Sequence, residues 1–414
     1  MSRINDLIKE LCPNGVRYNK LSEIGNQFSG LSGKSKNDFE NGNCKYITYT
    51  NIYNNPSTNL DVEDYVQVKE NEKQNEIKYK DILVAGSSEN LEDSGMISVV
   101  TKEPSEKIYL NSFCFGFRLN DNFYDKYNSD FLKHIFRDKN FRNEIISCSF
   151  GVTRYNLSKE KFLKIKIPCP PLEVQEEIVK ILDKFGELEA ELEAELEARK
   201  NQYEFWHGKL FDNSNGKVTK LSDLCTIGDG LHGTPHYVEG SEYYFINGNN
   251  LNNGKITYDD KTKKISKTDF DNQSILLNDN TLLMSINGTI GKVSYYNNEK
   301  IMLGKSVAYF NIKDKNRLSK KYLYYLLQSP NSIKYYQDSL TGSTILNLGL
   351  KSLREFEVQI PSIDEQNRVA NILERFDKLI NDITVGIPAE IELRRKQYEY
   401  YRNKLLSFEE LHYE

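Results

Sequence analysis

Histidine and cysteine are the residue types that most often hold a metal ion, but their spacing here does not suit one. His232 and His236 are four residues apart, and Gly233 and Pro235 between them prevent the helix that would place both imidazoles on one face. The six cysteines form no CxxC pair, and we expect reduced thiols at positions 12, 44, 114, 148, 169 and 225. The sequence therefore predicts neither a metal site nor a disulfide framework.

The motifs that bind nucleotides or transfer methyl groups are incomplete. Gly33-Lys34-Ser35 resembles the end of a phosphate-binding loop, but Phe28 occupies the position where that loop requires a glycine. Adenine methyltransferases carry an Asn/Asp-Pro-Pro-aromatic motif beside the flipped base, whereas Pro170-Pro171 is preceded by Cys169 and followed by Leu172. We therefore expect a chain that binds and positions, with any catalysis carried out by a partner.

Polar side chains in glycine-rich turns are the candidate nucleic-acid contacts, because such turns lift side chains off the scaffold and let backbone N–H groups approach phosphate. Arg154 follows Gly151 in such a turn and has the fork that suits a guanine edge, while a surface ion pair is the alternative. The candidates in the first half of the chain are Lys34, Ser87, Ser88, Thr153 and Arg154. Those in the second half are His232, Thr234, His236, Asn287, Thr289, Lys292 and Thr344.

The composition indicates folded domains with one strongly charged segment. Of the 414 residues, 38% are hydrophobic, 28% are charged and 12% are aromatic, which argues against disorder. Residues 187–198 read ELEAELEAELEA, and removing their six glutamates from a net charge of −5 leaves the rest of the chain at +1. No stretch of about 18 or more apolar residues and no secretory signal occurs, so we expect a cytoplasmic chain without a membrane span.

The sequence contains an internal repeat of about two hundred residues, and the elements expected to hold these turns occur once in each copy. Each copy begins with an α+β part in which helical interludes, at about 128–146 and 319–338, interrupt short β-branched runs such as residues 45–49. A long helix follows each part. The matching blocks are residues 20–24 with 220–224, 81–86 with 280–285, 151–157 with 342–348, 170–185 with 361–376, and 202–210 with 397–405.

The two long helices carry apolar residues at alternating spacings of three and four, which is the pattern of a coiled-coil seam. Pro170-Pro171 is expected to open the first helix, Ser362 with Glu365 to cap the second, and Pro388 to interrupt it. The alternative is two unrelated amphipathic helices, each packed on its own globule. The seam residues are Ile178, Ile181, Phe185, Leu188 and Leu192 in the first helix, and Val369, Ile372, Phe376, Leu379 and Ile383 in the second.

A chain that folds back in this way would be a two-headed molecule with an approximate two-fold axis. The fold class predicted is α+β, with two pseudo-repeated domains separated by two long antiparallel coiled-coil helices. Duplex DNA is itself dyad-symmetric, so two similar heads suit two half-sites. The two copies share an apolar framework but differ in their turns, so the heads are expected to read different sequences.

Several motifs resemble the specificity (S) subunit of type I restriction-modification systems over essentially the whole chain. They are the helical block at 172–210, the block at 386–401, the segments 230–235 and 245–251, and the run SINGTIGK at 285–292. The resemblance implies target recognition domains at 1–170 and 212–361 and conserved helical regions at 171–211 and 362–414. It implies a bipartite, asymmetric target in double-stranded DNA, two methyltransferase (M) subunits bound through the helical regions, and restriction (R) subunits in the full complex. No cofactor is expected in this chain, since S-adenosylmethionine, ATP and Mg would belong to the partner subunits.

If the chain is such a subunit, the glutamate-rich repeat is expected to act as a spacer. Each ELEA copy adds about 6 Å of helix, from about 1.5 Å per residue, so the repeat is hypothesised to set the unspecified gap between half-targets. The alternative is a solvated helix face. For the whole chain, the rival function is a non-catalytic two-headed protein-interaction scaffold spaced by a coiled coil. A complete restriction enzyme is disfavoured because its catalytic motifs are missing.

Overall fold

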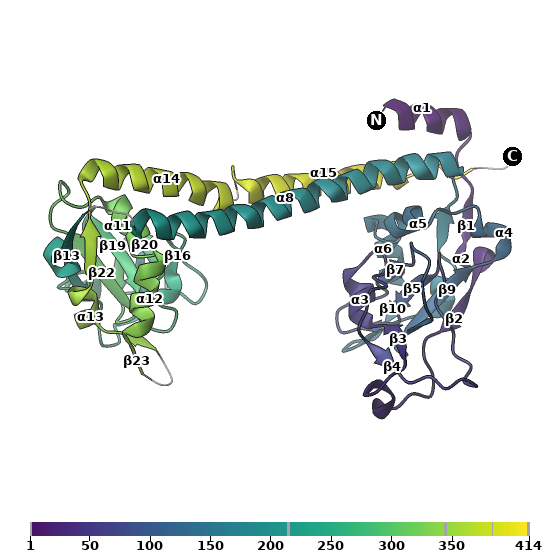
Figure 1. Cartoon of the computed structure of the whole chain (residues 1–414), viewed down its shortest axis with the longest axis horizontal. Helices are drawn as coiled ribbons and strands as arrows, with labels where there is room; N and C mark the ends of the chain where they lie inside the picture. The colour runs from purple at the N-terminus through teal and green to yellow at the C-terminus, as the bar shows by residue number, and fades with distance from the viewer. Residues whose placement is uncertain (1, 213–215, 343–345, 383, 412–414) are drawn as a thin grey trace. The chain divides into compact units, whose positions relative to one another are not determined.

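The protein divides into two compact units that share one long helix. A computed structural model describes residues 2–212, 216–342, 346–382 and 384–411. Unit 1 comprises Met1–Glu191 and Ile391–Glu414, and unit 2 comprises Leu192–Glu390. Each unit holds an α+β globule and one part of helix α8 (Leu172–Asp212), as the labels in Figure 1 show. The predicted α+β class, with a long helix between two similar domains, is confirmed.

An antiparallel sheet of four strands forms the centre of unit 1. All four residues of its strand β5 are buried: Ile82 and Val84 belong to one hydrophobic core, and Leu83 and Ala85 to another. Successive side chains of a strand point to opposite faces, so the sheet is covered on both sides. In spatial order the strands are β2 (Gly25–Ser29), β9 (Cys114–Leu119), β5 (Ile82–Ala85) and β7 (Ile97–Val99).

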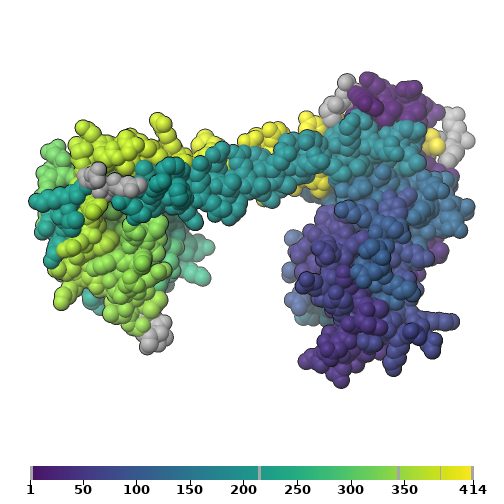
Figure 2. All heavy atoms as spheres, in the orientation of Figure 1, coloured from purple at the N-terminus to yellow at the C-terminus, as the bar shows by residue number. Residues whose placement is uncertain are grey.

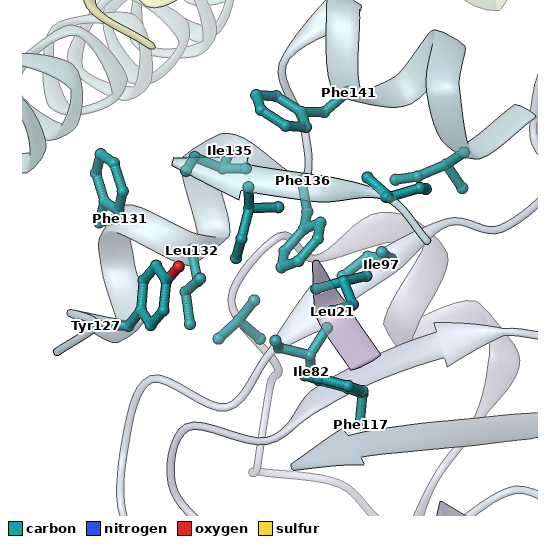
Figure 3. Close-up of a cluster of buried hydrophobic side chains, with 14 of the residues drawn as sticks. Leu21, Ile82, Ile97, Phe117, Tyr127, Phe131, Leu132, Ile135, Phe136 and Phe141 are labelled. Atoms are coloured by element: carbon teal, nitrogen blue, oxygen red, sulfur yellow. The ribbon is translucent and has the colours of Figure 1, made fainter. Parts of the chain in front are cut away.

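The larger core of unit 1 lies between this sheet and the helices α5 (Ser129–Ile135) and α6 (Lys139–Ser147). Figure 3 shows aromatic and aliphatic side chains of both helices gathered beside Ile82, Ile97 and Phe117 of the sheet. The side chains of Asn128 and Asp138 accept backbone N–H hydrogen bonds and so cap the two helices. The helical interlude predicted at 128–146 is therefore confirmed as two helices.

Three smaller sheets complete the globule, in the orders β4-β3-β8, β10-β11-β6 and β1-β12. The strand expected at 45–49 ends at Ile47, because the Thr48 hydroxyl accepts a hydrogen bond from the Asn51 N–H and starts helix α3 (Tyr49–Asn54). The strands are β1 (Tyr18–Lys20), β3 (Cys44–Ile47), β4 (Tyr65–Val66), β6 (Ser87–Ser88), β8 (Ile108–Leu110), β10 (Ser149–Phe150), β11 (Tyr155–Leu157) and β12 (Lys166–Pro168). The short helices are α1 (Ser2–Leu11), α2 (Leu21–Ile24), α4 (Asp121–Tyr124) and α7 (Lys159–Phe162).

The globule of unit 2 repeats this topology. Its central sheet has the order β14-β22-β19-β20, and its second sheet, β18-β15-β21, combines one antiparallel and one parallel pairing as β4-β3-β8 does. The internal repeat read from the sequence is thus a repeat of structure.

The elements of unit 2 follow a similar order to those of unit 1, with a further strand pair at 251–256 and a further helix at 267–271. Its strands are β13 (Lys217–Lys220), β14 (Cys225–Asp229), β15 (Tyr243–Ile246), β16 (Leu251–Asn252), β17 (Lys255–Ile256), β18 (Lys264–Ile265), β19 (Thr281–Ser285), β20 (Val293–Tyr295), β21 (Ile301–Leu303), β22 (Val307–Ile312), β23 (Leu340–Thr341), β24 (Asn347–Leu348) and β25 (Glu357–Ile360). Its globule helices are α9 (Leu221–Leu224), α10 (Lys267–Asp271), α11 (Lys320–Leu326), α12 (Pro330–Asp338) and α13 (Leu350–Glu355).

A buried glutamine fixes each long helix to its own globule. In unit 1 the Gln175 side chain accepts a hydrogen bond from the Asn128 N–H (2.8 Å) and donates to the carbonyls of Lys126 (2.8 Å) and Pro170 (2.7 Å). In unit 2 Gln366 makes the same three contacts, at 2.9 Å each, with the Ser319 N–H and with the carbonyls of Arg317 and Pro361. Each amide thereby joins the start of a helix to the loop before a globule helix.

The long helices pack both on their globules and on each other. In unit 1, Val174, Ile178 and Leu182 of α8 enter the globule core. Further along the same side of α8, the Phe185 ring lies 6.3 Å from Tyr398 and 5.4 Å from Tyr401 of α15 (Ile387–Leu406). Glu189, one turn further along α8, pairs with Arg395, which lies earlier in α15, so this pair of helices is antiparallel.

In unit 2, the second part of α8 packs against α14 (Ile363–Asn381), where the Tyr203 and Phe376 rings lie 6.4 Å apart. One seam position was wrong: Leu379 is exposed and the neighbouring Ile380 is buried, because α14 turns its apolar side toward its own globule as well as toward α8. Ile383 lies outside the described residues. The two packing modes that the sequence offered as alternatives therefore coexist.

The helix ends follow the sequence signals closely. The Ser362 hydroxyl accepts a hydrogen bond from the Glu365 N–H, as expected, although the Glu365 carboxylate pairs with Arg368 and does not close the capping box. Helix α8 starts at Leu172, one residue after the proline pair that was expected to open it. Helix α15 starts at Ile387, so Pro388 occupies its first turn.

Both ends of the chain contribute to unit 1. The Val16 N–H donates to the Glu409 carbonyl at 2.8 Å, and the Leu411 N–H donates to the Val16 carbonyl at 2.9 Å. Leu405 and Leu406, at the end of α15, are buried in the same core as α5 and α6. Figure 2 shows the C-terminal atoms in yellow against the teal atoms of α8. Unit 2 is therefore inserted between the two segments of unit 1.

Replacing Gln175 with leucine tests the helix anchor. The variant loses three hydrogen bonds and leaves one buried N–H and two buried carbonyls without a partner, so we expect unit 1 to lose about 3 kcal/mol of unfolding free energy. Urea unfolding followed by circular dichroism measures this loss. The control Gln202→Leu, on the exposed side of α8, is expected to change stability by about 0.5 kcal/mol or less. Equal effects of the two substitutions would contradict the anchoring role.

Candidate nucleic-acid interface

In unit 1 the small sheet β10-β11-β6 brings Arg154 and Ser87 together. Strands β11 and β6 pair so that Asn156 lies opposite Ser87, and the turn before β11 carries Arg154. The Arg154 Nε and Nη2 groups donate to the Ser87 hydroxyl oxygen at 3.3 and 3.1 Å. Gly151 makes the turn possible, because its φ is +128° and a Cβ there would lie 2.0 Å from the Arg154 carbonyl oxygen.

Arg154 and Ser87 line a cleft of about 340 Å³. The Arg154 guanidinium carbon lies 5.9 Å from the centre of the Phe113 ring, which is 65% exposed. Arg154 forms no ion pair with any residue that the structure describes, so the alternative of a surface ion pair is not supported. The remaining lining residues are Tyr49, Tyr53, Ser88, Glu89, Asn90 and Asp93.

The other two candidates near this cleft differ in their freedom to bind. Ser88 is buried and its hydroxyl accepts a hydrogen bond from the Asn90 N–H at 3.2 Å, so it supports the turn after β6. Thr153 is exposed in the turn that carries Arg154. The cleft thus combines one exposed guanidinium and the two serine hydroxyl groups with three aromatic rings and two carboxylates. Guanidinium and hydroxyl groups suit a base edge, and the carboxylates Glu89 and Asp93 disfavour a phosphate in the cleft itself.

In unit 2 the corresponding position is the loop after β19. Asn287 forms a bridge with Asn347 of β24, just as Ser87 pairs with Asn156 of β11 in unit 1. The Lys292 ammonium donates to the Asn252 side-chain oxygen at 2.9 Å, and Thr289 is exposed between them at the loop tip. The structure therefore brings Asn287, Thr289 and Lys292 into one loop. Thr344 lies outside the described residues.

His232 and His236 lie on the surface of unit 2 and each contacts an aspartate. The His232 Nε2 lies 2.8 Å from Asp229 Oδ2, and the His236 Nδ1 lies 3.2 Å from Asp269 Oδ2. His232, Asp229 and Asp269 line a cleft of about 410 Å³, whereas His236 and the exposed Thr234 lie outside its lining. Within the described ranges, no three His, Cys, Asp or Glu side chains form a group that could hold a metal ion.

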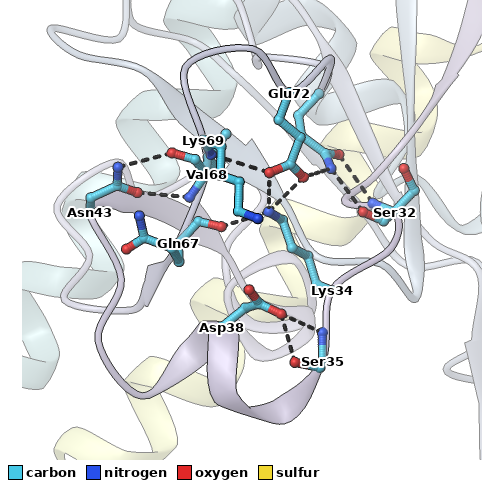
Figure 4. A network of polar contacts seen from close by, with 10 residues as sticks. Ser32, Lys34, Ser35, Asp38, Asn43, Gln67, Val68, Lys69 and Glu72 are labelled. Atoms are coloured by element: carbon cyan, nitrogen blue, oxygen red, sulfur yellow. Dashed lines mark hydrogen bonds and ion pairs between the residues drawn. The ribbon is translucent and has the colours of Figure 1, made fainter.

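Lys34 is the candidate that the structure supports least. Its side chain is only 5% exposed, and its ammonium donates to the Gln67 carbonyl and to the Glu72 carboxylate at 2.6 Å each (Figure 4). These bonds, together with those from Gln74 and the Lys69 N–H, lower the pKa of Glu72 to about 2. The turn that resembled the end of a phosphate-binding loop is therefore a closed structural network. The Lys34 ammonium is thus already bonded to two partners, and its role as a DNA contact stays a prediction.

Sequence comparison identifies the family. Residues 13–198 and residues 213–393 each match the type I restriction modification DNA specificity domain. The chain belongs to this family. Specificity subunits are the non-catalytic DNA-recognition components of type I restriction-modification systems. That this chain positions catalytic partners stays a prediction.

Two characterised or named relatives illustrate the similarity. The chain is 35% identical over 264 residues to the EcoR124I/EcoR124II specificity subunit of Escherichia coli, a match that covers 59% of this chain and 63% of that protein. It therefore spans less than two thirds of the Escherichia coli subunit. It is also 32% identical over 307 residues to the putative specificity subunit S.HindORF215P of Haemophilus influenzae, covering 69% and 73% of the two chains.

Solved structures share the fold of this specificity subunit. A chain from a structure on complex assembly and conformational transition of the type I R-M system has a TM-score of 0.70 at 15% identity, covering 95% of this chain and 98% of that chain. The HsdS subunit of Thermoanaerobacter tengcongensis has a TM-score of 0.55 at 16% identity, covering 96% and 97%. Among the described helices of this chain, none is long and apolar enough to cross a membrane.

Sequence reasoning missed most of the aromatic wall of the cleft in unit 1. Phe113 is the last residue of a polar turn between the buried strands β8 and β9, and its side chain is exposed. An aromatic residue in a polar turn could have been identified from the sequence as a candidate contact. Tyr49 and Tyr53 belong to α3, and nothing in their local sequence relates them to residues 87–93. Only the pairing of distant strands places them on one cleft.

The Lys34→Met variant of this specificity subunit separates structural from DNA-contact roles. Because the ammonium is bound inside unit 1, we expect a lower thermal midpoint, by about 3 °C or more, and an unchanged salt dependence of DNA binding. The midpoint follows from calorimetry, and the salt dependence from fluorescence anisotropy with duplex DNA. The control Lys36→Met removes an exposed charge from the same segment. A log–log salt slope that falls by about 1 in Lys34→Met would instead identify a phosphate contact.

Proposed function

We propose that each globule of this specificity subunit reads one half of a bipartite, asymmetric target in double-stranded DNA. The proposal rests on one observation: two globules of the same topology carry different polar groups at the same strand-edge position. Ser87 with Arg154 occupies that position in unit 1, and Asn287 with Lys292 occupies it in unit 2. A shared scaffold with different contact groups suits recognition of two different base sequences.

The contact chemistry follows from the geometry of the two loops. Arg154 is exposed, and its Nη1 group makes no hydrogen bond with any described residue, so the guanidinium retains donors for a guanine edge. The Lys292 ammonium uses one of its three donors on Asn252, which leaves two for a phosphate oxygen. His232, which lines the 410 Å³ cleft of unit 2, and the exposed Thr234 and His236 beside it are candidate contacts on exposure alone.

Two methyltransferase (M) subunits are proposed to dock on the helical regions. Phe205 of α8 and Tyr400 of α15 hold equivalent places in the repeat, two residues after Tyr203 and Tyr398, and they are 60% and 61% exposed. An exposed aromatic side chain at the same place in each unit suits a partner that binds twice. Restriction (R) subunits, and the S-adenosylmethionine, ATP and Mg of the partner subunits, complete the proposed complex in the cytoplasm.

Arg154→Ala is expected to change the recognition of one half-target only. A bidentate contact with a base discriminates against a wrong base by about 1–3 kcal/mol. We therefore expect methylation of sites with a changed base in that half-target to rise by about tenfold or more. Long-read mapping of methylated sites in cells that express the chain with its M partner measures this change. Asn287→Ala is the matched variant and should relax the other half. Equal loss on both halves would show a structural or general electrostatic role for Arg154.

The glutamate-rich repeat is proposed to set the gap between the half-targets. It lies within α8, with Leu188, Leu192 and Leu196 half-buried and the glutamates mostly exposed. Deleting one ELEA copy removes about 6 Å of helix, nearly two base-pair steps of about 3.4 Å. We expect the methylated sites to have a shorter gap with unchanged half-targets. An unchanged gap would leave the repeat as a solvated helix face.

The rival function, a two-headed protein-interaction scaffold, is disfavoured by the DNA specificity family to which the chain belongs. A salt titration separates the two functions, because DNA binding releases counterions and weakens steeply as salt rises.

A further inference from the structure

A cavity of about 820 Å³ in unit 1 carries an excess of positive charge that DNA recognition does not use. It lies where α5 and α6 meet α8 and α15, and the labels in Figure 1 locate these helices. Its cationic wall consists of Lys133, Arg137, Arg142 and Arg402. Its apolar wall consists of Pro56, Met96, Leu182 and the Tyr398 ring.

Arg402 has a buried guanidinium with no hydrogen bond. Its side chain is 13% exposed, and its Nε atom is buried without a partner among the described residues. Its Nε forms a loose ion pair with Oδ2 of Asp138 at 4.0 Å, and that oxygen accepts no hydrogen bond from the described residues. The guanidinium carbon lies 5.1 Å from the centre of the Tyr398 ring. A buried charge that lacks hydrogen bonds is costly, and the cost is relieved when an anion supplies the acceptors.

Arg137 and Arg142 add charge that no carboxylate of the described chain neutralises. Arg137 donates to the carbonyls of Ile52, Tyr53 and Ile97. Burial, with the neighbouring Arg142 and Arg402 guanidinium groups adding to it, lowers the pKa of Arg137 to about 10. The positive charges of these three arginines therefore act on the same cavity.

Arg142 likewise bonds only to backbone carbonyls, those of Glu92, Ser94 and Gly95. Its Nε group makes no hydrogen bond with the described residues and remains a possible donor.

The two acidic residues of the wall are neutralised by cations of their own. Asp183 accepts from Lys133 at 2.9 Å and contacts the His134 Nε2 at 2.8 Å. Glu187 pairs with Lys184 at 2.9 Å. Arg137 and Arg142 therefore have no carboxylate at ion-pair distance among the described residues, and Arg402 has only the 4.0 Å contact with Asp138.

Unit 2 folds around the same helix junction without these cations. Helices α5 and α6 match α11 and α12 with an offset of 191 residues, the same offset that relates Gln175 to Gln366. The counterparts of Arg137 and Arg142 are therefore Gln328 and Ile333. The counterpart of Arg402, by the match of Tyr398 with Tyr203, is His207, whose Nε2 donates to the Tyr325 carbonyl at 2.8 Å. The junction thus does not require arginines, and a partner that docks on both units would not need them. A ligand held by these arginines would therefore be specific to unit 1.

We propose that this cavity binds the phosphate of a small nucleoside phosphate, with Arg402 as its main donor. A guanidinium fork matches two phosphate oxygens, and a buried one gives a strong charge-assisted contact. The volume lies within the range of about 300–1,000 Å³ that is typical of small-molecule sites, and exceeds the need of a bare ion. The Tyr398 ring and the apolar wall provide a surface for the base and sugar.

Calorimetric titration of the full-length chain with adenosine monophosphate, adenosine triphosphate and inorganic phosphate tests the site. We expect saturable binding of one nucleotide per chain, and weaker binding of inorganic phosphate. Arg402→His introduces the residue that unit 2 already accommodates, and should weaken nucleotide binding at least about tenfold. The control Lys404→His, which removes an exposed charge from the same helix, should leave the affinity within about twofold.

A second variant guards against misfolding. Arg142→Ile also copies unit 2, and it should weaken nucleotide binding while the far-ultraviolet circular dichroism spectrum stays that of the wild type. No saturable nucleotide binding by the wild type, or equal affinity in Arg402→His, would overturn the proposal. It would also be overturned if Arg402→His weakened only duplex DNA, because the cavity would then serve a backbone phosphate. The test is independent of DNA reading, since Arg154→Ala is expected to bind nucleotide normally.

Discussion

One buried amide in each unit holds the structure together at the point where a globule meets a long helix. Gln175 and Gln366 each satisfy one backbone N–H and two carbonyls that would otherwise lack partners in the interior. Leucine or valine could fill the same space but could not provide those bonds. These directional hydrogen bonds therefore fix the direction in which each helix leaves its globule. The apolar contacts of Ile178 and Val369 stabilise the same arrangement.

On this shared frame the two globules differ where contact with DNA is proposed and agree where packing decides. The strands β5 and β19 both alternate their side chains between two cores. The positions just beyond them differ, with Ser87 in one unit and Asn287 in the other. The helix junctions show the same division, because arginines in unit 1 are replaced by neutral residues in unit 2. The two halves thus share an apolar framework and differ in polar side chains of the turns and of the helix junction.

The sequence was sufficient for the repeat, the fold class, the long helices and the break before Pro388, because these depend on periodicity, capping residues and proline, which are local signals. It was insufficient where distant segments meet. Lys34 lies in a polar turn that contains glycine, so its ammonium was expected to be available for DNA. It is instead bonded to the carboxylate of Glu72, 38 residues along the chain. Leu379 fitted the heptad spacing, but the globule under α14 selects Ile380. The pairing of Arg154 with Ser87 was predicted only as two separate candidates, since strand register joins them.

The order of synthesis determines when the core of unit 1 can be completed. All of unit 2, residues 192–390, is synthesised before the last segment of unit 1. Until that segment arrives, the first globule lacks Leu405 and Leu406 from its core and the backbone partners of Val16. The domain translated first is consequently the one completed last. A nascent chain halted before residue 391 would leave the apolar side chains that contact Leu405 and Leu406 uncovered.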